Sequence, residues 1–278
     1  KLKMLNIVLF GPPGAGKTFT AQHIIGILLS KGKRIGISSN SHKAIINLMA
    51  GVADHLLKEN ITGQLIKVGG DSDDIIFNKP NVIFKRNAQA CGSELNASAL
   101  CMGGTAWLFC NPNLTEEQGI TIFDYLFIDE AGQVSIANLV GMSRIAKNII
   151  LMGDQMQLGQ PSQGSHPEDS GLSILEYLLK DQATIPVDMG VFLPKTYRMH
   201  TDVCRLISEQ VYDGYWFDYT KYGNGGFQIV NDKHRDFFKY MRDFYFENAD
   251  KVNTISQTYG VGVDQTILNF NLNTQNVD

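Results

Sequence analysis

The segment GPPGAGKT, at residues 11–18, carries the most specific chemistry of the 278-residue chain. It follows an apolar run at 5–10 and precedes a helical pattern at 17–30. A glycine-rich turn in that position lets backbone N–H groups surround phosphate oxygens at the start of a helix. We expect Lys17 to reach the β- and γ-phosphates of a nucleoside triphosphate, and the Thr18 hydroxyl to bind Mg²⁺. The phosphate-binding set is Gly11, Pro12, Pro13, Gly14, Ala15, Gly16, Lys17 and Thr18.

Two adjacent acidic residues, Asp129 and Glu130, follow another apolar run at 125–128. A strand there would end at the carboxyl edge of a parallel sheet, where open α/β sheets bind their ligands. We expect Asp129 to complete the Mg²⁺ shell and Glu130 to be the general base that polarises the attacking water. Two acids after a strand are commonly only a solvated strand end, so the phosphate loop is what gives them weight.

A third apolar run, at 149–152, leads into the polar loop GDQMQLGQP at 153–161. The amide of Gln157 can hydrogen bond both to a phosphate oxygen and to a water, which suits a sensor of the γ-phosphate. A fourth segment, TYRMH at 196–200, offers the planar guanidinium of Arg198 for a transferring phosphoryl group. The sequence alone does not place Arg198 against the nucleotide.

These motifs need a scaffold of alternating strands and helices. The predicted strands are 5–10, 34–38, 122–128 and 148–152, and the predicted helices are 17–30, 41–57, 171–180 and 202–212. Such alternation is typical of a parallel sheet that helices cover on both faces. We therefore predict an α/β fold for the part of the chain before residue 216.

The last part of the chain has a different composition. Residues 216–278 contain 13 aromatic residues, against 14 in the preceding 215, and they contain no proline. A helical pattern spans 236–246, and a turn is predicted at 223–226. No motif with recognisable chemistry lies in this segment.

Composition and charge exclude several classes of protein. With 44% hydrophobic and 19% charged residues, the chain is neither disordered nor collagen-like, and no apolar stretch approaches about 18 residues. The four cysteines lack the short spacing of a zinc site, so we expect no metal there and a reducing cytoplasmic setting without a membrane. The net charge is −4, but residues 1–110 carry 12 Lys and Arg against 6 Asp and Glu, which favours a polyanion near that part.

Taken in order, the motifs resemble those of superfamily 1 helicases, in the branch of the nonsense-mediated-decay RNA helicase and related bacterial DNA helicases. The pair DEAGQ at 129–133 and GDQMQLGQP at 153–161 is the most specific part of the match. SSNSHKAI at 38–45 and GGTAW at 103–107 match segments that contact nucleic acid in that family. The resemblance covers about residues 5–214.

The resemblance implies a RecA-like P-loop NTPase fold, in which a parallel sheet is flanked by helices and Mg²⁺·ATP lies between two lobes. The implied catalytic residues are Lys17, Glu130, Gln157 and Arg198, and the implied metal ligands are Thr18 and Asp129. Tyr197 matches the position that stacks on adenine. Ser39, Asn40 and Thr105 match positions that contact the backbone of single-stranded nucleic acid, in keeping with the basic first part of the chain.

The resemblance also sets the expected domain boundaries. We expect an ATP-binding lobe at 1–190, the start of a second RecA-like lobe at 191–215 and a divergent aromatic-rich segment at 216–278. Thr201 replaces a proline that often follows His200, and nothing after 215 resembles the late motifs that couple nucleic acid to ATP. With an incomplete second lobe, we expect nucleotide binding, slow hydrolysis and no unwinding by this chain alone.

The function predicted on this basis is that of an ATP-dependent helicase or translocase motor domain. Single-stranded DNA is favoured over RNA as the partner, and a separate second lobe or a fused nuclease is left open. A non-catalytic nucleotide-binding module is one alternative, and it would be insensitive to Glu130→Gln. A P-loop kinase for a small molecule is another, and hydrolysis stimulated by nucleic acid would exclude it.

Overall fold

The computed structural model describes residues 6–91, 94, 97–115, 123–157, 159, 167–180, 182, 184–186, 189–212 and 217–218. The chain divides into two compact units, Lys1–Leu193 and Pro194–Asp278, and each unit is described by itself. The turn predicted at 223–226 and the helix predicted at 236–246 lie outside the described residues.

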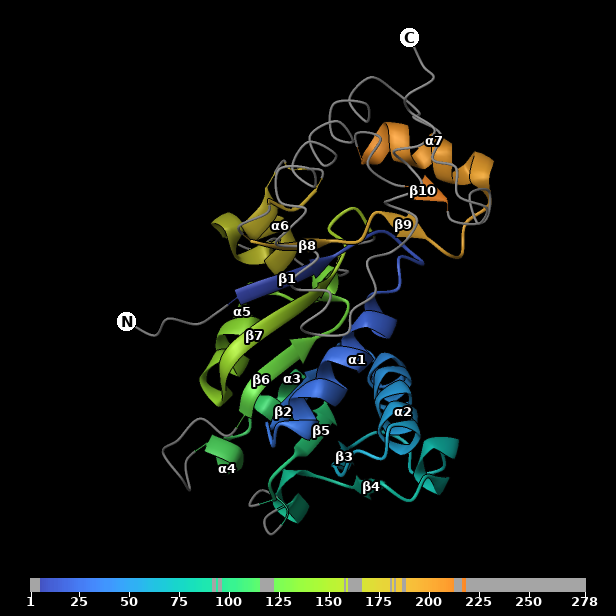
Figure 1. Ribbon diagram of the computed structural model, residues 1–278. Coiled ribbons are helices and arrows are strands. Elements are labelled where there is room, and N and C mark those ends of the chain that lie inside the picture. Colours follow the sequence, from blue (N-terminus) through green and yellow to red (C-terminus); the bar gives the residue numbers. More distant parts are fainter. Residues whose placement is uncertain are drawn as a thin grey trace, which may run out of the picture. The chain divides into compact units, whose positions relative to one another are not determined.

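The first unit is built on an eight-stranded sheet in which all neighbouring strands run parallel (Figure 1). The order across the sheet is β4-β3-β5-β2-β6-β7-β1-β8. The strands are β1 (Asn6–Phe10), β2 (Ile35–Ser38), β3 (Gln64–Val68), β4 (Val82–Lys85), β5 (Leu100–Gly104), β6 (Phe123–Ile128), β7 (Ala146–Gly153) and β8 (Gly190–Phe192). The predicted RecA-like α/β fold is confirmed.

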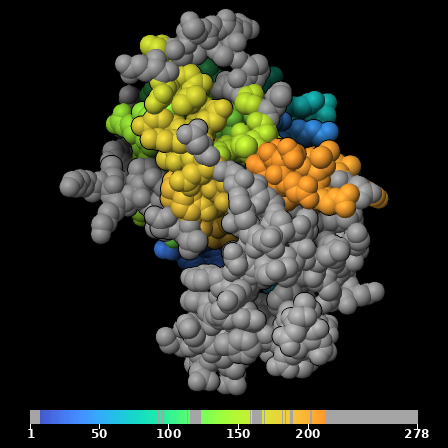
Figure 2. All heavy atoms as spheres, turned by 90° about the horizontal axis from the view of Figure 1, so that it is seen from above, coloured from blue at the N-terminus to red at the C-terminus, as the bar shows by residue number. Residues whose placement is uncertain are grey.

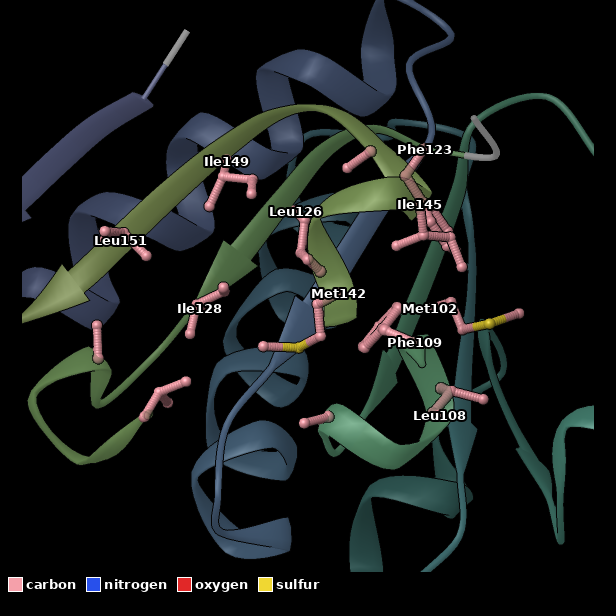
Figure 3. Packing of buried hydrophobic residues seen from close by; sticks show 14 of the residues in the cluster. Met102, Leu108, Phe109, Phe123, Leu126, Ile128, Met142, Ile145, Ile149 and Leu151 are labelled. Atoms are coloured by element: carbon pink, nitrogen blue, oxygen red, sulfur yellow. The ribbon is translucent and has the colours of Figure 1, made fainter. Parts of the chain in front are cut away.

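Helices cover both faces of this sheet. They are α1 (Lys17–Ser30), α2 (His42–Lys58), α3 (Ala106–Phe109), α4 (Pro112–Thr115), α5 (Ile136–Met142) and α6 (Ile174–Leu179). Helices α1 and α2 lie side by side and pack on one face, where the buried cluster includes Ile37 and Phe127 (Figure 1). On the other face, Phe109 and Met142 pack against strand residues such as Leu126 (Figure 3).

Local sequence explains why α2 begins and stays where it does. The Ser41 hydroxyl accepts the backbone N–H of Ala44 at 3.4 Å, so it caps the helix as predicted. The buried side chains recur at helical spacing along one side: Ile45, Leu48, Met49, Val52, Ala53 and Leu56. Because that side faces the sheet, the residues just before α2 are held at the carboxyl end of β2.

The second unit has few described elements. They are the parallel pair β9 (Lys195–Thr196) and β10 (Phe217–Asp218) and the helix α7 (Thr201–Val211), which packs on β10. Cys204 and Tyr212 are buried there. Helix α7 is orange in Figure 2, and its Val203 and Leu206 side chains are exposed. Among the described residues of the whole chain, no helix is long and apolar enough to cross a membrane.

Candidate functional site

The loop between β1 and α1 is a tight turn that only glycine allows at its key positions. Gly14 and Gly16 have φ of 78° and 84°, in the left-handed region that glycine adopts readily. Gly11 donates its backbone N–H to the Gly153 carbonyl at 3.3 Å, and a Cβ on Gly11 would lie 3.0 Å from that of Ala15. The turn thus closes on itself and on the end of β7.

Lys17 and Thr18 occupy the first turn of α1, directly after this loop. The Lys17 ammonium donates to the carbonyl of Gly11 at 2.5 Å and to that of Pro12 at 3.3 Å. Its charge therefore lies within the loop, where phosphate oxygens would meet it. Thr18 is partly buried one residue further along the helix.

Asp129 is a buried carboxylate at the end of β6, with only 6% of its surface exposed. Its backbone N–H donates to the Ser38 carbonyl at 2.8 Å, and its Oδ1 accepts the Glu130 backbone N–H at 3.0 Å. Burial, and then the charge of Glu130, raise the pKa of Asp129 to about 6, against the opposing hydrogen bond from the Glu130 N–H and the positive charge of Lys17. A nearby cation would favour the ionised form of this carboxyl group.

Glu130 adopts a backbone conformation that side-chain-bearing residues rarely take. Its φ of 53° and ψ of 44° are left-handed, and the residue precedes the short 3₁₀ turn η4 (Ala131–Gln133). Such conformations cost about 1–3 kcal/mol and cluster at functional sites. The Glu130 side chain is partly exposed, whereas Asp129 beside it is buried, so the two acids have different environments.

The loop after β7 is organised around Asp154, which is 2% exposed. Its Oδ1 accepts the Met156 backbone N–H at 3.0 Å, and its Oδ2 accepts the Gln157 Nε2 at 3.3 Å. This carboxylate therefore fixes both the turn and the amide of Gln157. The predicted sensor is thus held by a buried acidic neighbour.

The loops after β6 and β7 pack backbone against backbone. A Cβ on Gly132 would lie 2.7 Å from the carbonyl oxygen of Asp154, and a Cβ on Gly153 would lie 3.0 Å from the Ala131 nitrogen. Both glycines are therefore required by the close approach of the other loop. The acidic pair and the glutamine loop form one rigid assembly.

Strand order explains why these elements converge. Strands β6, β7 and β1 are consecutive in the sheet and parallel, so their carboxyl ends share one edge. The structure brings Lys17, Asp129, Glu130 and Gln157 to this edge, which we call the nucleotide rim, with the phosphate loop at 11–18. The residues fit a Mg²⁺·triphosphate: the glycine turn places backbone N–H groups and the Lys17 ammonium where phosphates would bind, and a cation would favour the ionised form of the buried Asp129 carboxyl group.

The next strands in the sheet carry the residues that were expected to contact nucleic acid. Asn40 follows β2, is exposed, and donates its side-chain Nδ2 to the carbonyl of Gln133. Thr105 follows β5, and the register pairs Ser38 with Gly104 just before these two exits. Ser39 is buried, at 1% exposed, and its hydroxyl accepts the Ser41 backbone N–H at 3.3 Å. Asn40 and Thr105 lie at the surface or near it; Ser39 lies beneath.

Tyr197 and Arg198 belong to the second unit. Both are exposed, and the buried Thr196 hydroxyl accepts the backbone N–H groups of Arg198 at 3.2 Å and Met199 at 3.3 Å. That turn fixes the backbone that presents both side chains.

Two residues were missed by the sequence reasoning. Lys67, in the middle of the apolar run LIKV, is completely buried and bonded to His42. Trp107, part of the GGTAW segment, was given no role, yet it is 85% exposed on α3. The sequence did offer signals for both residues. Lys67 interrupts an apolar run, and Trp107 lies two residues after Thr105, which was expected to contact nucleic acid.

The cysteines do not form a site. Burial raises the pKa of Cys101 to about 12; burial, and then the charge of Glu94, raise that of Cys91 to about 11. These buried thiols are therefore protonated at neutral pH. Within the described ranges, no group of three or more His, Cys, Asp or Glu residues could hold a metal ion.

The fold and the rim define a RecA-like domain of the P-loop NTPase class. Residues 1–164 match the AAA domain family, and the chain belongs to that family. The loop at 11–18 lies within the matched residues.

Curated relatives carry helicase names. The DNA replication ATP-dependent helicase/nuclease DNA2 of Saccharomyces cerevisiae is 29% identical over 210 residues, which are 74% of this chain and 13% of the yeast protein. The Homo sapiens protein of the same name is 26% identical, over 87% of this chain and 22% of its own length. The DNA polymerase alpha-associated DNA helicase A of Schizosaccharomyces pombe is 26% identical, over 76% and 37%.

The resemblance to superfamily 1 helicases is confirmed by these relatives, and the chain is a superfamily 1 helicase-like region. It spans between about an eighth and two fifths of the lengths of these three relatives. Among solved structures, that of arterivirus nonstructural protein 10 (helicase) with DNA matches with a TM-score of 0.45 and 16% identity, over 77% of this chain and 41% of that one.

Proposed function

We propose that this chain is the ATP-binding and nucleic-acid-binding part of a helicase motor, and that it hydrolyses Mg²⁺·ATP when a single strand is bound. The observation that carries the proposal is the convergence of Lys17, Asp129, Glu130 and Gln157 on one rim, with Asp129 close enough to Lys17 for the lysine charge to act on its pKa. The helicase names of the relatives support it.

Each residue of the rim has a proposed part in hydrolysis. The loop at 11–18 and Lys17 hold the β- and γ-phosphates, while Thr18 and Asp129 hold Mg²⁺, which supplies positive charge at the phosphates when bound. Glu130 takes the proton of the attacking water, since its carboxylate is partly exposed beside the buried Asp129. Gln157, held by Asp154, orients that water and senses the γ-phosphate.

We propose roles in the same reaction for two residues of the second unit. Arg198 is proposed to stabilise charge on the transferring phosphoryl group, and Tyr197 to stack on adenine. We propose domain boundaries at 1–190, 191–215 and 216–278, close to the division between the two compact units after Leu193. Because the late coupling motifs are not recognisable after 215, we expect slow hydrolysis without unwinding.

The nucleic-acid strand is proposed to lie across the exits of β2 and β5. Asn40 and Thr105 would contact its backbone, and Ser39 would shape the turn through the Ser41 N–H. The excess of Lys and Arg over Asp and Glu in residues 1–110 supports binding of a polyanion at this half of the edge. We propose DNA over RNA, since the names of the relatives specify DNA helicases.

The deciding experiment is ATP hydrolysis by the purified chain, with and without single-stranded DNA or RNA. We expect stimulation by DNA that Lys17→Ala abolishes, and a Glu130→Gln variant that still binds ATP but no longer turns it over. ATP hydrolysis that neither single-stranded DNA nor RNA stimulates, or that persists in Glu130→Gln, would contradict the proposal. Phosphoryl transfer to an added small molecule would favour a kinase.

A further inference from the structure

Lys67 is a lysine with no exposed surface, at the carboxyl end of β3. Its ammonium donates to three acceptors: the Val68 carbonyl at 2.9 Å, the Gly69 carbonyl at 2.7 Å and Nδ1 of His42 at 3.0 Å. An ammonium has three N–H groups, so its hydrogen-bonding capacity is used fully. Buried lysines are rare because desolvation disfavours the charged form, and burial lowers the pKa of Lys67 to about 8.

The surroundings of Lys67 hold no compensating carboxylate among the described residues. In the sheet, Lys67 pairs with Gly103 of β5 and Phe84 of β4. From α2, the titratable group that contacts the Lys67 ammonium is His42. The next residue of β4 with a charge is Lys85, whose ammonium pairs with Glu94. The exposed Arg86 follows, and Lys43 on α2 is exposed. Because burying a charged lysine costs free energy, we expect the Lys67 ammonium to do something that an apolar side chain could not.

His42 is the first residue of α2 and the partner that Lys67 holds. Since an ammonium only donates, Nδ1 of His42 must accept, which places the imidazole proton on Nε2 and requires a neutral ring. Burial, and then the charge of Lys67, lower the pKa of His42, which keeps the ring neutral. The ring also lies against Gly70, where a Cβ would come within 3.0 Å of Nδ1.

The hydrogen bond between Lys67 and His42 holds the segment just before α2. His42 follows Ser41, which caps α2, and Asn40, which donates to the carbonyl of Gln133. One short path therefore leads from β3 through Lys67 and His42 to the exit of β2, and on to the turn that begins at Glu130.

We propose that Lys67 is a positioning residue that, through His42, fixes the start of α2 and with it the Asn40 backbone for binding a single strand. This inference rests on the proposed function, because Asn40 contacts nucleic acid only in that proposal. Lys67 itself touches no phosphate, since all three of its N–H groups are used within the protein.

The test measures binding of a fluorescein-labelled single-stranded oligodeoxythymidylate to the 278-residue chain by anisotropy. Lys67→Met keeps the length of the side chain without its donors, and we expect about tenfold weaker binding, as for loss of a buried hydrogen bond to a charged group. The slope of log affinity against log salt should stay unchanged, whereas loss of a phosphate contact would reduce it by about one. Lys147→Met, which removes an equal charge from the ion pair with Asp124, is the matched control and should bind nearly as the wild type does.

His42 provides the second arm. In His42→Asn the amide oxygen replaces Nδ1 as the acceptor, so binding at neutral pH should be retained, whereas His42→Phe should lose as much as Lys67→Met. As the pH falls below the ordinary range of an imidazole, the wild-type ring takes up a proton and loses its acceptor, so wild-type binding should weaken while that of His42→Asn does not. This arm decides the matter if Lys67→Met fails to fold.

The outcomes separate the two proposals. If the wild type binds the oligonucleotide and Lys67→Met and His42→Phe bind equally well, the positioning role is overturned and the proposed function stands. A reduced salt slope in Lys67→Met, or equal acid sensitivity of wild type and His42→Asn, also overturns the positioning role. If the wild type binds a fluorescent ATP analogue but no oligonucleotide, or neither, the nucleic-acid part of the proposed function fails and this inference fails with it.

Discussion

Gly132 faces Asp154 so closely that a Cβ on Gly132 would lie 2.7 Å from the Asp154 carbonyl oxygen. Asp154 in turn holds the amide of Gln157, and Gly132 lies two residues after Glu130. The proposed base and the proposed sensor are therefore placed by one backbone contact between two loops. A change at this contact should therefore affect both loops.

The first prediction tests this contact. Gly132→Ala forces the two loops apart, so we expect a loss of about 1–3 kcal/mol in the free energy of unfolding and a lower kcat for ATP hydrolysis. Gly159→Ala is the control, because a Cβ there would meet no described atom within 4 Å. Urea denaturation and steady-state hydrolysis measure the two effects. Equal stability and turnover in both variants would show that the contact does not constrain the rim.

A second prediction concerns the left-handed backbone of Glu130. Glu130→Gly relieves a strained φ of 53°, so we expect stability to rise by about 1 kcal/mol while hydrolysis is lost. Glu130→Gln keeps the strain and loses only hydrolysis. Asn60→Gly, at the same φ, should gain less because asparagine tolerates this region. Thermal unfolding compares all three, and a Glu130→Gly protein no more stable than Glu130→Gln would contradict the prediction.

The third prediction follows from the pKa of Lys67, which burial lowers from 10.5 to about 8. Between these values the unfolded chain keeps the proton and the folded chain does not, so stability rises with pH across that window. Below pH 8 both states are protonated, and the cost of the buried charge is fully present. Lys67→Met lacks this dependence.

We therefore expect the stability of wild type relative to Lys67→Met to increase between pH 8 and 10.5, by up to about 1.4 kcal/mol per pH unit. Denaturant midpoints at several pH values measure this difference. A difference that stays constant or falls across the window would mean that Lys67 is not a desolvated ammonium.

Trp107 gives the fourth prediction. Its side chain is 85% exposed beside Thr105, at the exit of β5, so a bound strand should be able to stack a base on it. Trp107→Ala should weaken oligonucleotide binding by about 1–3 kcal/mol, while Trp107→Phe should retain most of it. The tryptophan fluorescence of the wild type should be quenched by the oligonucleotide. Undiminished affinity in Trp107→Ala would remove the indole from the interface.

The meeting of the phosphate loop, the acidic pair and the glutamine loop at one sheet edge could be predicted from the sequence because these motifs are local. Asp129 comes directly after an apolar run, and Lys17 and Gln157 come within a short loop of one. Parallel strands bring these carboxyl ends to one edge of the sheet. The predicted strands and helices before 216 are all present, with ends shifted by a few residues. Helix α2 begins where its Ser41 cap predicts.

Other features depend on contacts between distant segments and could not be read locally. Strand β3 was missed because Lys67 interrupts its apolar run, and a charge there normally indicates an exposed position. Ser39 matches a position that contacts nucleic acid in the resembled family, yet it is buried in this structure. Its burial depends on packing that the motif does not encode. The meeting of Gly132 with Asp154 joins two loops whose spacing in the sequence carries no signal. The roles proposed for Tyr197 and Arg198 stay predictions.

Strands β2 and β6 are neighbours in the sheet, and the peptide N–H of Asp129 ends on the carbonyl of Ser38. One backbone hydrogen bond of the β-ladder therefore joins the half of the edge proposed for the triphosphate to the half proposed for the polynucleotide. A backbone shift caused by either ligand would reach the other half of the edge through this main-chain hydrogen bond. Because both atoms of this hydrogen bond belong to the backbone, coupling between the two halves should tolerate most side-chain substitutions. It should be lost mainly when a substitution shifts the backbone at Ser38 or Asp129.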